Sequence, residues 1–147
     1  MPSQGKKYEY LEHTADIKFL AYGGETVEEV FENAALAMFN VIIDTEKVSG
    51  ETEREVLLTS PDLESLLVDW LSELLYLFEV DEVVFWKFQV EEIREEEGEY
   101  SIKALASGEK YYPESHPFET EIKAVTYNQL ELEKTAGGWK AQVVVDI

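Results

Sequence analysis

Cysteine is absent from this chain, and no long apolar run is present either. The lack of cysteine excludes a disulfide framework, a thiolate zinc site and a cysteine nucleophile, and it fits an intracellular protein. A membrane span needs roughly 20 apolar residues, whereas the longest apolar stretch, 63–80, is interrupted by four acidic residues. Because residues 1–7 are also too short and polar for a signal peptide, we expect a soluble, cytoplasmic protein.

Positive charge is scarce. The 147 residues contain 12 Lys and Arg against 32 Asp and Glu, for a formal net charge of −20. Strong nucleic-acid binding depends on basic side chains that neutralise phosphates, so if RNA is involved, a basic partner protein should hold it. An acidic surface also promotes solubility and is common in thermophiles. We therefore treat only a few of the acidic residues as functional candidates.

Several catalytic and binding motifs are missing as well. The chain has no G-x-S-x-G nucleophile elbow, no G-x-x-x-x-G-K-[ST] phosphate loop and no G-x-G-x-x-G fingerprint, and Gly23-Gly24 predicts only a turn. A stand-alone metal-dependent hydrolase is disfavoured, because no convincing constellation of nucleophile and base is present. A plain calcium buffer is disfavoured by the absence of a D-x-[DN]-x-[DN]-G loop.

Two segments have the pattern of amphipathic helices. In the first, Thr26 and Glu29 form a capping box, and apolar residues then recur at helical spacing as far as Ile42. In the second, Ser60 is the expected cap and Pro61 the expected first helical residue, followed by a broad apolar face up to position 78. Both apolar faces are typical of core packing.

The rest of the chain alternates with the period of two that strands show. The expected strands cover 17–21, 54–58, 84–90, 100–106, 122–126, 130–132 and 139–145, with turns at 95–98 and at Gly137-Gly138. Within 84–90, Trp86 is expected to share a face with Val84 and Phe88. We predict an α+β fold in which one domain spans residues 1–147. It would be a sandwich with a mostly antiparallel sheet and two amphipathic helices packed on one of its faces.

Acidic groups near the two ends of the chain are the leading candidates for chemistry. The block from Glu12 to Asp16 precedes the first expected strand, and a polar turn is the simplest interpretation of it. Asp146 alternates with apolar strand residues and is followed by Ile147, whose main-chain carboxylate adds a further pair of oxygens. Asp16, Asp146 and that carboxylate could form a site for a hard cation such as Ca²⁺, Mg²⁺ or Mn²⁺. Only the fold can bring the two ends together.

The histidines and one lysine are further candidates. His13 and His116 either make structural hydrogen bonds or serve as metal ligands. His116 lies in an expected loop, which could be a mobile contact surface. Lys123 either makes a surface ion pair of little energetic value or holds an acid of the cluster or a phosphate.

Three ordered blocks resemble the signatures of the archease family. They are Y-L-E-H-T-A-D-I at 10–17, K-A-V-T-Y at 123–127, and G-G-W at 137–139 followed by V-D-I at 145–147. Together they span nearly the whole chain. One departure is Asn128, where many members of the family carry a histidine.

The resemblance implies a function and a set of site residues. Archeases assist RtcB-type tRNA-splicing RNA ligases, promoting guanylylation of the ligase's active-site histidine and repeated turnover, and are not enzymes themselves. A role as chaperone or specificity modulator of a tRNA-modifying methyltransferase is the alternative. Carried over to this chain, a divalent cation reported as calcium would be held by Asp16, Asp146 and the terminal oxygens of Ile147. Lys123 matches a functional lysine, and Glu12 and His13 are candidates to surround the cation or contact the partner.

Overall fold

The strands build two separate antiparallel sheets. The computed structural model describes residues 5–11 and 16–147. One sheet has the order β1-β2-β7-β6 and the other the order β3-β5-β4. The strands are β1 (Tyr8–Leu11), β2 (Asp16–Tyr22), β3 (Thr52–Ser60), β4 (Val83–Glu96), β5 (Glu99–Lys110), β6 (Ala124–Thr135) and β7 (Gly138–Asp146).

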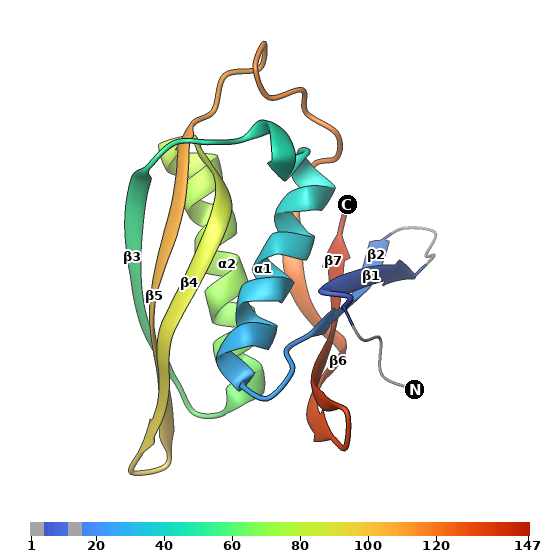
Figure 1. Ribbon diagram of the computed structural model, residues 1–147, viewed down its shortest axis with the longest axis vertical. Helices are drawn as coiled ribbons and strands as arrows, with labels where there is room; N and C mark the ends of the chain where they lie inside the picture. Colours follow the sequence, from blue (N-terminus) through green and yellow to red (C-terminus); the bar gives the residue numbers. More distant parts are fainter. Residues whose placement is uncertain (1–4, 12–15) are drawn as a thin grey trace.

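The two long helices lie between the sheets. Helices α1 (Val27–Ile42) and α2 (Leu63–Asp81) fill the middle layer, and the short 3-10 helix η1 (Thr45–Lys47) follows α1 (Figure 1). The α+β class and the antiparallel pairing are confirmed. The arrangement differs from the expected one, because the helical layer has one sheet on each of its two faces. Such cover requires a helix to be apolar around much of its circumference, and nine of the 16 residues of α1 are buried.

Local signals set the start of α1 correctly but misplace the start of α2. The Thr26 side chain accepts a hydrogen bond from the Glu29 backbone N–H at 3.2 Å, which confirms the expected cap. In α2 the cap is Asp62, which accepts from the Ser65 N–H at 2.7 Å. The prediction of Ser60 is wrong because Ser60 still pairs with Tyr100 as the last residue of β3.

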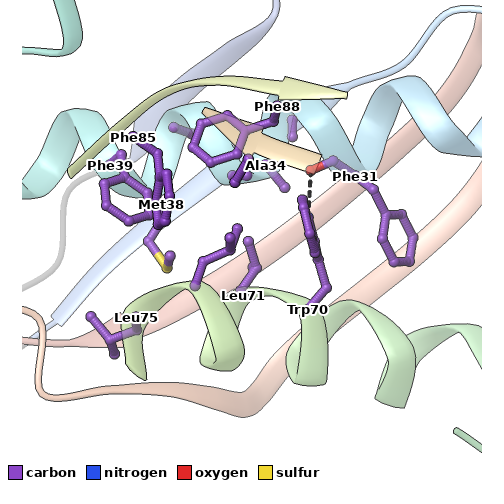
Figure 2. Packing of buried hydrophobic residues seen from close by; sticks show 14 of the residues in the cluster. Phe31, Ala34, Met38, Phe39, Trp70, Leu71, Leu75, Phe85 and Phe88 are labelled. Atoms are coloured by element: carbon purple, nitrogen blue, oxygen red, sulfur yellow. Dashed lines mark hydrogen bonds between the residues drawn. The ribbon is translucent and has the colours of Figure 1, made fainter. Parts of the chain in front are cut away.

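Aromatic side chains join the helices to β4 in the core. The ring centroid of Phe39 on α1 lies 5.5 Å from that of Phe85 and 5.6 Å from that of Phe88. Across the core, the indole N–H of Trp70 on α2 donates to the carbonyl of Phe31 at 3.0 Å, as Figure 2 shows. The indole is fully buried, so this bond satisfies its only polar group.

Two irregularities in β4 alter its expected face pattern. The pairing register shifts between Phe85 and Lys87 and again between Val90 and Glu92. The expectation for Trp86 is therefore wrong: the bulge buries Phe85 completely and leaves Trp86 38% exposed. β4 is an edge strand, and its Val90 N–H donates to the Glu32 carboxylate of α1 at 2.8 Å. Burial raises the pKa of Glu32.

Two further differences concern the four-stranded sheet. β1 was not expected from the sequence, because it is only four residues long and half exposed. β6 is one strand where two were expected, with its register shifted between Thr126 and Glu131. None of the helices in the described ranges is both long enough and apolar enough to cross a membrane.

Candidate functional site

The fold brings the two ends of the chain together at one end of the four-stranded sheet. β2 and β7 are neighbours, and the first residue of β2, Asp16, pairs with the last residue of β7, Asp146. Directly opposed residues of antiparallel strands have Cα atoms about 4.5–5.5 Å apart. Residues from the first and last parts of the sequence therefore become adjacent through strand pairing alone.

The two carboxylates share the outer face of the sheet. Val143 and Val145 are completely buried against the helices, so Asp146 points away from them. Asp16 lies directly opposite and takes the same side. Asp146 is exposed, whereas Asp16 is half-buried, with its Oδ1 atom shielded from solvent. Like charges placed directly opposite one another repel.

Lys123 lies at the same end, beside β7. Its backbone N–H donates to the carbonyl of Asp146 at 2.8 Å, and the next residue, Ala124, pairs with Asp146 in the sheet. β7 lies between β2, which carries Asp16, and β6, which begins at Ala124. The backbones of β2 and β6 are therefore about 10 Å apart. The Lys123 side chain is exposed and takes part in none of the ion pairs between described residues. It is therefore available to an anionic group that approaches this edge.

The remaining expected site residues fall into two groups. Ile147 follows Asp146 directly and is exposed. Glu12 and His13 lie outside the described residues. Within 5–11 and 16–147, no group of three or more His, Asp or Glu side chains is arranged to hold a metal ion.

The donors at this end suit a hard cation in kind but not in number. Asp16, Asp146 and the main-chain carboxylate of Ile147 offer only oxygen atoms, which Ca²⁺ prefers. Calcium takes six to eight ligands, so these three groups would supply part of the coordination shell. Water or a partner protein would have to supply the rest.

His116 makes structural hydrogen bonds, which is the first of the two roles expected for it. The ring is 2% exposed; its Nδ1 atom accepts from the Tyr112 backbone N–H at 3.0 Å, and its Nε2 atom donates to Glu109 at 2.8 Å. This bond and a second one from the Ser49 N–H lower the pKa of the Glu109 carboxyl. The loop 111–123 does expose side chains, but the buried imidazole of His116 cannot itself be a contact surface.

A bulge in β6 was missed at the sequence level. Thr126 pairs with Val144 and Glu131 pairs with Gln142, so residues 127–130 lie opposite the single residue Val143. The available signal was the break in strand alternation between Thr126 and Leu130.

Comparison with known proteins identifies the family. Residues 8–147 match the model of the archease protein family (MTH1598/TM1083). This chain belongs to the archease family. The matched range contains Asp16, Lys123 and Asp146; strand pairing places Asp16 opposite Asp146, and a backbone hydrogen bond places Lys123 beside Asp146.

Archease relatives match along their whole length. The chain is 99% identical over 147 residues to protein archease of Methanosarcina mazei, with all of both chains covered. It is 43% identical over 143 residues to protein archease of Pyrococcus furiosus, covering 97% of this chain and 99% of that one. The resemblance carried by the three sequence blocks is therefore confirmed.

Solved archease-family structures share the fold. The solution structure of Methanobacterium thermoautotrophicum protein 1598 superposes with a TM-score of 0.83 at 43% identity, covering 96% of this chain and 99% of that one. The crystal structure of an archease from Thermotoga maritima, described as a possible chaperone, gives a TM-score of 0.57 at 25% identity. It covers 93% of this chain and 94% of that one.

Proposed function

We propose that this protein is an accessory factor, with no reaction of its own, that activates an RtcB-type tRNA-splicing RNA ligase. It would promote guanylylation of the ligase's active-site histidine and so allow repeated turnover. The observation that carries the proposal is the pairing of Asp16 with Asp146 on neighbouring strands, with Lys123 bonded to the Asp146 backbone beside them. These three residues are called the carboxylate row below. The description of the Thermotoga relative as a possible chaperone supports the more general part, assistance to another protein.

The charge of these groups suits the chemistry of the ligase. Guanylylation consumes a triphosphate and releases pyrophosphate, and such transfers need positive charge around the phosphates. A calcium ion, or another hard divalent cation, held by Asp16, Asp146 and the terminal carboxylate of Ile147 would supply such charge. The Lys123 ammonium group would pair with a phosphate or a carboxylate nearby.

The overall charge suits the expected partner. An RNA ligase must present basic groups to RNA phosphates, and this chain carries a net charge of −20. Complementary potentials accelerate encounter and orient the two surfaces. The acidic surface would therefore dock on the RNA-binding groove, with the carboxylate row directed at the active site.

The test is ligase guanylylation with labelled GTP, with this protein present in sub-stoichiometric amounts. We expect the wild type to stimulate turnover and the Asp16→Ala/Asp146→Ala variant to lose at least about tenfold of the stimulation, in line with the loss of transition-state charge stabilisation. A double substitution of Glu53 and Glu55 by Ala, on exposed positions of β3, removes the same number of carboxylates from the other sheet. Full stimulation by the Asp16/Asp146 variant would overturn the mechanism.

A further inference from the structure

The bulge at 127–130 is a formed structure held to the sheet at both ends. At its start, the Thr126 hydroxyl donates to the Val144 carbonyl at 2.8 Å and accepts from the Asn128 N–H at 3.2 Å. At its end, the Gln142 amide donates to the Gln129 carbonyl at 2.8 Å. These bonds fix the path of the chain, including the left-handed backbone of Gln129 with a φ of 54°.

The bulge presents an aromatic side chain to solvent. Tyr127 is 58% exposed, and Asn128 beside it is exposed as well. Tyrosine on a fixed backbone offers a large contact area at a low entropic cost, which explains its enrichment among the residues that anchor protein interfaces.

The bulge lies close enough to the carboxylates to belong to the same interface. Tyr127 is three residues along β6 from Ala124, the partner of Asp146, which corresponds to about 10 Å of strand. A standard interface covers about 800 Å² per partner, or a disc of roughly 16 Å radius. A partner seated on the carboxylate row therefore reaches Tyr127.

Protection of an edge strand explains the bulge itself but not its side chain. β6 is at the edge of its sheet, and bulges at such edges prevent pairing with another chain. That function needs an interrupted ladder and would be served by a charged residue equally well. Here an aromatic residue occupies the position in a chain with 32 acidic residues.

We propose that the 127–130 bulge is a docking element for the ligase, with Tyr127 as its anchor. This assignment rests on the proposed function. The counterpart on the ligase would be an arginine-bearing surface beside the active-site entrance, because guanidinium groups stack on aromatic faces and an RNA-binding surface supplies them. In this assignment, Tyr127 determines the affinity for the ligase. The carboxylates determine the stimulation reached once the complex has formed.

The experiment titrates the protein against a fixed amount of ligase and separates half-saturating concentration from maximal stimulation. We expect Tyr127→Ala to raise the half-saturating concentration about tenfold or more, as for a typical interface anchor, with the maximum unchanged. Tyr127→Phe should stay close to the wild type, because the ring is retained. The Asp16→Ala/Asp146→Ala variant should show the opposite division, with a lower maximum.

Tyr76→Ala on α2 is the matched control, since Tyr76 is 55% exposed and lies outside the four-stranded sheet. It should leave both parameters unchanged. If the wild type stimulates and Tyr127→Ala behaves like Tyr76→Ala, the docking assignment is overturned and the proposed function stands. If the wild type does not stimulate, the proposed function is overturned and the docking assignment falls with it. Circular dichroism and thermal unfolding of each variant confirm that the fold is intact.

Discussion

The opposed carboxylates of Asp16 and Asp146 carry an energetic cost for the isolated protein. They occupy directly paired positions of antiparallel strands, where like charges are destabilising. A structural role would favour a neutral or oppositely charged pair at this position. A cation bound between the two carboxylates would offset their repulsion.

This cost can be measured on the protein alone. We expect Asp146→Asn to raise the free energy of unfolding by about 0.2–1 kcal/mol, because it removes one of two opposed charges. Urea unfolding, followed by tryptophan fluorescence with and without calcium, is the measurement. Calcium should stabilise the wild type, since a ligand that binds the folded state raises its stability, and should stabilise the variant much less.

Glu55→Gln, at an exposed position of β3, is the control and should change neither quantity. Equal stabilisation of the wild type and Asp146→Asn by calcium would contradict a role for Asp146 in cation binding.

Among the elements, the loop 111–123 is the one whose anchoring bears most directly on the site. It connects β5 of one sheet to β6 of the other, and Figure 1 shows it crossing one end of the molecule. His116 and Glu109 hold its beginning, the Glu119 N–H donates to the Ile42 carbonyl at 2.8 Å, and Lys123 ends it beside Asp146. The position of Lys123 therefore depends on contacts far from the carboxylates.

The hydrogen bonds that hold Glu109 predict a specific pH dependence of the protein's stability. Hydrogen bonds from His116 and Ser49 lower the pKa of Glu109 from its ordinary value of 4.5, so the ionised carboxylate stabilises the fold above that value. The stabilisation is lost as the pH falls through the lower pKa of the folded state. We expect Glu109→Gln to be less stable than the wild type at neutral pH, with a difference that shrinks below pH 4.5. Urea unfolding across this range is the measurement.

Glu99→Gln on the same strand, where the side chain is exposed, should show no such convergence. A stability difference between Glu109→Gln and the wild type that does not shrink as the pH is lowered below 4.5 would contradict the role of Glu109 in holding the loop, because protonation removes the charge that its hydrogen bonds stabilise.

Prediction from sequence succeeded where the signal is local. The Thr26 cap of α1 and the turn before Glu99 depend on neighbouring residues, and they appear as expected. The second turn, expected at Gly137-Gly138, forms one residue earlier, at 136–137. It failed where a distant strand decides the outcome. Ser60 was expected to cap a helix but pairs with Tyr100, and Trp86 turns outward because a bulge shifts its register against β5.

The same distinction applies to the candidate site. The residue types at Asp16, Lys123 and Asp146 could be selected from the sequence, partly through the family resemblance. Their adjacency could not, because no spacing rule links the first part of a chain to the last. It follows from the pairing of β2 with β7 and of β7 with β6. Tyr127 lies in one of the blocks that resemble the family but was not selected as a contact residue, because a bulge interrupts the alternation that defines strands.

The whole molecule is an anion with 32 acidic and 12 basic residues, which makes its association sensitive to salt. We expect the concentration needed for half-maximal ligase stimulation to rise several-fold between about 50 and 300 mM salt, because screening weakens attraction between exposed charges. Maximal stimulation should change little, since buried contacts are screened less. Titrations at three salt concentrations provide the measurement. A half-saturating concentration independent of salt would exclude electrostatic docking.

The placement of Asp16 and Asp146 in paired strands has one more consequence. Their backbones are joined by the ladder of β2 and β7, and Lys123 is joined to the same strand by its own backbone bond. The separation of the three backbone segments is thus set by their hydrogen bonding, and only the side chains can move toward an incoming ligand. Under the proposed function, the backbone beneath these side chains keeps its spacing during docking, so larger adjustments must be made by the ligase.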